Sequence, residues 1–357
     1  MEKDNYISTV KALGIILMVL GHSIGPNIVC RFIYMFHMPL FFFCSGYFFK
    51  APLSVKSVGR FTVKRFRGLY FPFIKWGVLF MLLHNLFCTW GLYDASLYGY
   101  YGFSDYLLRM RSLFFTMTGQ EQLLDPFWFL KELLMASVLI CFIMFFLRKI
   151  ENVYIDIFLW LLLILLTVVT KPGDLGLPII WNLSILFLSS TFLFAGYLYR
   201  KLEIVKSYSV LGLFLSFLFL FMAVWYWNDS LDMLWYSSGS VLFYIPSALV
   251  GIYMVFSASY LIERYYFKHV LYYIGQNTLT ILTWHLLVFK LISLLKINFY
   301  GLPIEKLSEK GAISEHNDFF WILYTLFGVI VPLACNYFFK MCYSNTKKLL
   351  DYEKRSR

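Results

Sequence analysis

The sequence predicts an all-α membrane protein, a polytopic bundle of about ten transmembrane helices that forms one domain over residues 1–357. Three observations predict this fold class. First, 60% of the residues are hydrophobic and 14% are charged, whereas soluble domains carry about a quarter charged residues. Second, apolar runs of membrane-spanning length follow one another along the whole chain, so no stretch remains for a separate soluble domain. Third, the segments that connect these runs are alternately rich and poor in lysine and arginine.

Each run is close to the roughly 20 residues that a helix needs to cross the hydrocarbon of a bilayer. The first run follows a short segment of mixed charge and has no small-residue cleavage site, so we expect a retained helix and no signal peptide. The ninth run is the most polar, because it contains Gln276, Asn277 and His285. The predicted spans are residues 10–27, 32–49, 69–90, 128–147, 154–170, 179–199, 209–227, 240–262, 272–294 and 319–341.

The basic residues predict how these spans are oriented. With the N-terminus in the cytoplasm, the inner segments hold 21 of the 31 lysines and arginines, and the outer segments hold 8. Cytoplasmic loops of membrane proteins carry such an excess. Both termini are therefore expected in the cytoplasm. The net charge of +11 follows from this topology, and we expect no nucleic-acid partner.

Two ionisable residues lie in the first span. Lys11 precedes His22 by eleven residues, so on a helix the two side chains fall within roughly 20° of one face and about 16 Å apart. Ionisable groups inside membranes are costly and mark functional sites. A neutral imidazole can take a proton from a hydroxyl, which makes His22 a candidate catalytic base, although it could also be a structural histidine bonded to another helix. Lys11 could neutralise a donor phosphate or anchor the helix at the interface.

Four other polar residues are candidates for binding an acceptor or supporting the site. His37 begins the second span and could bind substrate or simply start a helix at the outer interface. Glu132 lies one turn into the fourth span, where an acid needs a partner, and we favour a substrate hydroxyl. Asn277 and His285 lie about 80° apart on a helix and need not share a site. His285 could form a polar wall of the site or a hydrogen bond between helices.

A basic segment without any acid runs from Lys50 to Arg67. It could form a loop that cradles the phosphates of a donor substrate, or anchor the chain on anionic lipid. Lys64, Arg65 and Arg67 lie next to the third span and favour the donor, so they are candidate donor-binding residues together with Lys11. The first residues of the segment favour lipid.

Other reactive residue types are expected to have no chemical role. The six cysteines form no CxxC pair and lie mostly in apolar runs, so we expect no disulfide frame and no metal site. The Ser45-Gly46 pair favours close helix packing, because nothing around it resembles a nucleophile elbow.

Five stretches carry a resemblance to a known family. Lys11 and His22 are separated by ten residues, and residues 36–49 read FHMPLFFFCSGYFF. The later motifs are RGLYFP from Arg67 to Pro72, Trp128-Phe129-Leu130, and GQNTLTILTWH from Gly275 to His285. With these motifs in order over nearly the whole chain, the sequence resembles the acyltransferase 3 family of integral membrane O-acyltransferases, which includes sugar and glycan O-acetyltransferases.

The resemblance implies roles for these residues. His22 would be the catalytic histidine and Lys11 the donor-binding basic residue. Many relatives have arginine at the position of Lys11 and aspartate at that of Ser8. The resemblance further implies acetyl-CoA or another acyl-CoA as a donor substrate from the cytoplasm, and no permanently bound cofactor. The acceptor would be a hydroxyl of a cell-surface or lipid-linked glycan, and the protein would be a multi-pass protein of the bacterial cytoplasmic membrane.

Two other classes of protein fit the same composition. A polysaccharide exporter or lipid-linked glycan transporter would also place polar groups near the middle of a helix bundle, but it would not require His22 as a base. A structural partner of a glycan-synthesis complex would not bind the donor. The outer segment 91–127, rich in tyrosine, could be an aromatic lid or an interfacial anchor.

Overall fold

The computed structural model describes residues 2–150, 152–170, 178–203, 208–226, 231–234, 241–263, 268–316 and 318–355. Within these ranges every regular element is a helix, which confirms the all-α prediction. Seven of the described helical segments are long and apolar enough to cross a membrane, and two shorter apolar helices accompany them. The protein is thus a polytopic membrane helix bundle.

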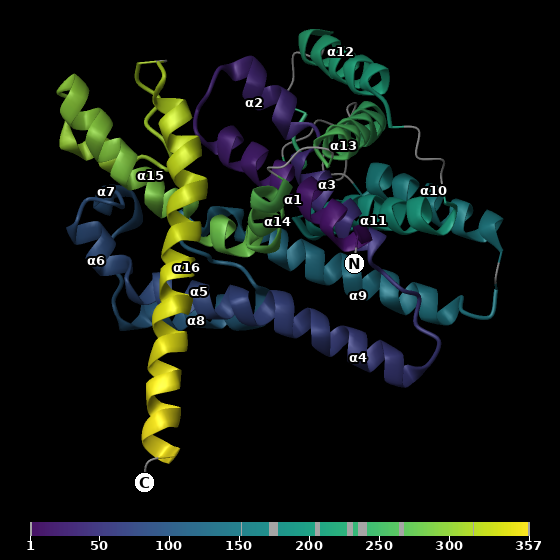
Figure 1. The fold of residues 1–357 in the computed structure, drawn as a ribbon, viewed down its shortest axis with the longest axis horizontal. Helices are drawn as coiled ribbons and strands as arrows, with labels where there is room; N and C mark the ends of the chain where they lie inside the picture. The colour runs from purple at the N-terminus through teal and green to yellow at the C-terminus, as the bar shows by residue number, and fades with distance from the viewer. Residues whose placement is uncertain are drawn as a thin grey trace.

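The helices follow the predicted order along the chain. The first part contains α1 (Glu2–His22), α2 (Asn27–Tyr34), α3 (His37–Tyr47), α4 (Val55–Arg65), η1 (Phe66–Tyr70), α5 (Phe71–Leu82), α6 (His84–Thr89), α7 (Ala95–Tyr98), α8 (Phe103–Thr116) and η2 (Gln122–Phe127). The second part contains α9 (Trp128–Phe146), α10 (Val153–Val169), α11 (Pro178–Lys201), α12 (Val210–Tyr226), α13 (Val241–Ile262), α14 (Lys268–Gln276), α15 (Thr278–Tyr300), η4 (Ile304–Ser308) and α16 (Phe320–Arg355). Figure 1 shows α16 extending past the rest of the bundle to the C-terminus.

The third predicted span, residues 69–90, is not one helix. Helical structure already begins at Val55, continues through the π-helical turn η1, and ends at Leu82, where the short α6 follows. The Ser54 side chain accepts a hydrogen bond from the Ser57 amide and so caps α4. The basic segment expected as a loop is therefore mostly helical, and Arg65 has a fixed position at the end of α4.

The ninth predicted span is also displaced. Its first residues form α14, which packs against α1, and the long helix α15 begins only at Thr278. Asn277 adopts a non-helical conformation between the two helices. A Cβ at Gly275 would lie 1.8 Å from the Ser8 carbonyl oxygen, so α14 and α1 touch through their backbones.

The outer segment 91–127 is folded into helices rather than a loop. The segment packs on the buried His84 of the preceding helix α6, whose Nδ1 lies 2.8 Å from Glu121 Oε2. The Tyr101 ring stacks on His84 at 3.4 Å between ring centroids, and its hydroxyl donates to Glu121 Oε1 at 3.1 Å. In the same segment, α8 packs against α5. These contacts fix the segment against the bundle.

Helices α3 and α11 make the closest contact in the core. A Cβ at Gly46 would lie 1.7 Å from the Leu193 carbonyl oxygen, and one at Gly196 would lie 2.0 Å from the Phe43 carbonyl oxygen. Small residues allow such an approach in membrane proteins. The packing role predicted for the Ser45-Gly46 pair is confirmed for Gly46.

Candidate active site

A cavity of about 280 Å³ lies between α1, α3, α9, α15 and the junction of α4 with η1. On α1 it is lined by Lys11, Ile15 and Met18, which share one helical face because they lie four and three residues apart. The other lining residues are Met38, Phe41, Cys44, Ser45, Phe48, Arg65, Gly68, Leu69, Phe129, Leu130, Leu133, Thr278, Leu279 and Leu282.

One end of this cavity is cationic. Lys11 and Arg65 both line it, and none of its described lining residues is acidic. Arg65 Nη2 donates to Ser45 Oγ at 2.7 Å, which directs the guanidinium toward α3. Burial lowers the pKa of Arg65 to about 10, so the side chain stays charged at neutral pH. Two cations beside a small cavity form a favourable site for an anion such as a phosphate.

The structure separates the predicted donor-binding residues into two groups. Lys11 and Arg65 come together at the cavity, whereas the side chains of Lys64 and Arg67 are exposed and do not line it. Ser45, for which the sequence predicted only a role in helix packing, also accepts a hydrogen bond from Arg65. No sequence pattern links it to Arg65, which lies 20 residues further along the chain.

The two walls of the cavity lead to a pair of histidines. On α1, His22 follows Met18 by four residues, and on α15, His285 follows Leu282 by three, so each continues the face that lines the cavity. The centroids of the two imidazole rings lie 5.5 Å apart. The helical faces of α1 and α15 that line the cavity therefore continue to the imidazole pair, although neither histidine lines the cavity itself.

His285 is completely buried, and its backbone contacts fix its tautomer. Nδ1 lies 3.0 Å from the Ile281 carbonyl oxygen and 3.1 Å from that of Leu282, so Nδ1 carries the proton. Nε2 is then a lone-pair acceptor, and it has no hydrogen-bond partner among the described residues. Buried polar atoms are nearly always paired, so this nitrogen is free to accept a hydrogen bond from a substrate or from His22.

His37 lies at the same end of the site. It is buried, and its Nδ1 bonds to the Ile33 carbonyl oxygen at 3.0 Å. The Tyr34 ring packs edge-on against His37 at 5.1 Å and against His22 at 6.3 Å. The structure thus brings His22, His37 and His285 together, with Tyr34 as an aromatic contact that the sequence did not single out.

Glu132 and Asn277 lie away from the imidazole pair. Glu132 is buried on α9 and makes no hydrogen bond within the described part of the chain; it is not a lining residue of the cavity, although Phe129 and Leu133 are. The Asn277 side chain donates to the Tyr273 carbonyl at 2.8 Å and accepts from Asn336 Nδ2 at 3.0 Å. Asn277 therefore connects α14 to α16, near the Lys11 end of the cavity.

The segment between α15 and α16 covers the His22 end. A Cβ at Gly311 would lie 3.8 Å from the His22 carbonyl oxygen. The neighbouring Lys310 forms an ion pair with Asp125 at 2.9 Å. The segment is held by the buried Lys290, whose Nζ donates to the carbonyl oxygens of Leu307 at 2.8 Å and Glu309 at 2.5 Å.

These features define a class of protein, a membrane helix bundle with a cavity lined by two cations and an imidazole pair further along two of the helices that line it. The chain belongs to the acyltransferase 3 family: the family profile described as an acyltransferase domain matches residues 4–341. The match confirms the resemblance seen in the Lys11 and His22 motif, and the protein is thereby a membrane acyltransferase. No curated protein and no solved structure matches the chain.

Proposed function

We propose that the protein transfers an acyl group, in the simplest case acetyl, from acyl-CoA to a hydroxyl of a cell-surface or lipid-linked glycan. The observation that supports this proposal is the shared face of α1, which carries Lys11 beside Arg65 at the cavity and, further along, His22 beside His285. The beginning of α1 would face the cytoplasm of a bacterial cell, where acyl-CoA is available. The acceptor would approach from the opposite side, beneath the segment between α15 and α16.

The shape of the site supports this division of roles. The donor phosphates would contact Lys11 and Arg65, which line the cavity, and the exposed Lys64 and Arg67 would contact the part of the nucleotide that stays outside it. The pantetheine arm would extend along Ile15 and Met18. The thioester would then lie beside His22, about 16 Å from Lys11 by helix rise.

The chemistry requires one base. His22 would accept the proton of the acceptor hydroxyl while its oxygen forms a bond to the thioester carbonyl carbon. The carbon–sulfur bond would then break, and the proton would pass to the departing sulfur, which leaves an ester and free coenzyme A. His285 Nε2, a buried acceptor, would orient the hydroxyl or the His22 ring.

The replacement His22→Ala tests the proposal. A general base typically contributes about 10²–10⁴-fold to turnover, so we expect release of free coenzyme A from acetyl-CoA by the purified protein to fall by that range. His269→Ala is a matched control, because His269 is exposed on α14. Near-normal turnover by His22→Ala would contradict the enzyme mechanism, and absence of donor turnover in the native protein would favour a transporter.

The acceptor can be identified separately. We expect cells that lack the protein to lose an acyl mass from one envelope glycan or lipid-linked sugar, measured by mass spectrometry. Restoring the native chain should restore this mass, whereas the His22→Ala chain should not. An unchanged set of acyl groups in the deleted strain would contradict a glycan acceptor.

A further inference from the structure

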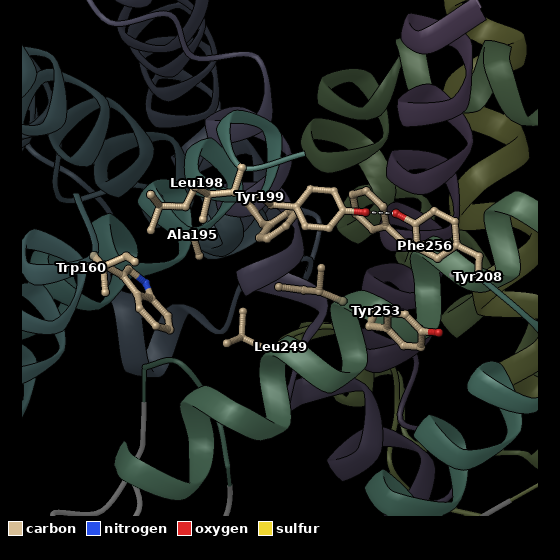
Figure 2. Close-up of a pocket in the computed structure, with 12 residues that line it drawn as sticks. Trp160, Ala195, Leu198, Tyr199, Tyr208, Leu249, Tyr253 and Phe256 are labelled. Atoms are coloured by element: carbon tan, nitrogen blue, oxygen red, sulfur yellow. Dashed lines mark hydrogen bonds between the residues drawn. The ribbon is translucent and has the colours of Figure 1, made fainter. Parts of the chain in front are cut away.

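A second cavity, of about 460 Å³, lies beside Tyr208 (Figure 2). It shares no lining residue with the candidate active site, and none of its described lining residues is charged. Polar groups in its wall are engaged: Trp160 Nε1 donates to the Thr191 carbonyl oxygen at 3.1 Å, and the Tyr199 and Tyr208 hydroxyls bond to each other. The buried charges that the proposed mechanism does not use lie elsewhere, on α15.

Two lysines of α15 are buried in the bundle. Lys290 is 2% exposed and Lys296 is 3% exposed, and a charged ammonium inside a membrane protein is costly unless it is paired. The four carbonyl oxygens that accept from the two ammonium groups, at 2.5 to 3.2 Å, belong to Leu307, Glu309, Ile313 and His316. Lys296 also lies 3.7 Å from the Asp318 carboxylate. All four carbonyl groups lie in residues 301–316, which we call the strap.

The strap joins three elements around His22. It follows α15 directly, and the Gln122 side chain of η2 donates to the Ser308 carbonyl oxygen at 3.2 Å. At Gly311 the strap reaches the end of α1, where an added Cβ would lie 3.8 Å from the His22 carbonyl oxygen. The strap therefore lies over the end of α1 that carries the proposed catalytic base, and His22 itself is only partly exposed.

Lys290 makes the strongest attachment of the strap near His22. It binds the strap two and four residues before Gly311, and its ammonium is shielded from water. The nearby ion pair between Lys310 and Asp125 is weaker, because both side chains are about half exposed, at 53% and 44%. Hydrogen bonds from a buried charged donor are roughly twice as strong as neutral ones. Loss of the Lys290 charge should therefore loosen the strap over His22.

We propose that Lys290 is a positioning residue, which holds the strap over His22 and so keeps water from the bound thioester. The inference rests on the proposed function, because only a protein that binds acyl-CoA has a thioester to protect. With the strap displaced, the oxygen of a water molecule would bond to the thioester carbonyl carbon. The carbon–sulfur bond would break, and a water proton would pass through His22 to the sulfur, which leaves a carboxylic acid and free coenzyme A. Closing an active site prevents such hydrolysis.

The first test measures hydrolysis of acetyl-CoA by the purified protein without an acceptor, as release of free thiol. We expect Lys290→Met to raise the rate about tenfold, the factor that corresponds to losing one hydrogen bond from a charged group. A lost fold would lower the rate instead. The rise should disappear when His22→Ala is added, because hydrolysis in the site needs the same base.

The matched control is Lys306→Met. Lys306 also belongs to the strap, but it is about one-third exposed and pairs with Glu309 and Glu315 at 2.9 and 2.5 Å, which lie within the strap itself. Its replacement removes a lysine without detaching the strap from α15, so we expect a native rate of hydrolysis. Lys296→Met, at the second attachment, replaces Lys290→Met if the latter does not fold, and it should raise the rate in the same way.

The second test does not depend on catalysis. His22→Cys introduces a thiol beneath the strap, and its alkylation by a water-soluble maleimide can be followed by mass spectrometry of the peptides. We expect added Lys290→Met to speed this alkylation about tenfold and added Lys306→Met to leave it unchanged. Cys141 is completely buried, so its alkylation reports any loss of the fold.

The two readouts separate the outcomes. Equal alkylation and equal hydrolysis in the Lys290→Met and Lys306→Met proteins would overturn the role of Lys290. Faster alkylation with unchanged hydrolysis would overturn the exclusion of water from the thioester, although the strap would still cover His22. Absence of acetyl-CoA turnover from the native protein and from every variant would instead contradict the proposed function, and the protection of a thioester with it.

Discussion

Lys11 is the residue at which the proposed donor site begins, and its side chain offers a point charge where an arginine would offer a guanidinium fork. We expect Lys11→Met to raise the KM for acyl-CoA far more than it lowers kcat, because a phosphate contact is made equally in the ground and transition states. Lys11→Arg should keep activity or tighten donor binding. Initial rates against acyl-CoA concentration measure both effects.

The control for the Lys11 variants is that both are inserted correctly into the membrane. Both should reach the membrane in the native orientation, which accessibility labelling of introduced cysteines can verify. A correctly inserted Lys11→Met protein with an unchanged donor KM would show that the lysine only anchors α1, and it would leave the role of His22 untouched.

At the scale of elements, α4 decides which basic residue reaches the cavity. Arg65 points inward and bonds to Ser45, whereas its neighbour Lys64 is exposed. A hydrogen bond to a charged group contributes about 1.5–3 kcal/mol, so we expect Arg65→Gln to weaken acyl-CoA binding about tenfold or more. Lys64→Gln is the matched control and should change binding much less. Equal effects of the two variants in a detergent binding assay would contradict the inward role of Arg65.

The outer segment 91–127 depends on a different buried contact. His84→Leu would leave the Glu121 carboxylate buried without its imidazole partner, which costs about 1.5–3 kcal/mol for a hydrogen bond to a charged group. We expect a lower thermal unfolding midpoint in detergent. His269→Leu should leave the midpoint unchanged, because His269 is exposed. Equal midpoints for His84→Leu and the native protein would show that the segment is held by other contacts.

The sequence predicted most helices, because long apolar runs form helices wherever a bilayer leaves no water for the backbone. It failed at residues 69–90, where hydropathy marked a span but did not detect the cap at Ser54 or the interruption before His84. It also failed at Asn277, whose non-helical backbone separates α14 from α15 and whose side chain bonds to Asn336 of α16. Hydropathy does not record a local polar cap such as that of Ser54, and the bond between Asn277 and Asn336 joins residues far apart in the sequence.

The site was predictable to a similar extent. Helix periodicity placed Lys11 and His22 on one face, and the cavity follows that face. The proximity of His285 to His22, and of Arg65 to Ser45, could not be derived from spacing within one helix. Each of these pairs arises from contacts between helices, and a single sequence contains no direct record of those contacts.

At the scale of the whole molecule, the contact between α3 and α11 limits how this chain can evolve. Neither Gly46 nor Gly196 has room for even a methyl group while the backbones stay as close as they are. Any descendant that retains this architecture must therefore keep glycine at both positions. Replacements of the α3 residues that line the candidate active site, such as Met38 and Phe41, can alter the shape of the cavity while the helix itself stays in place.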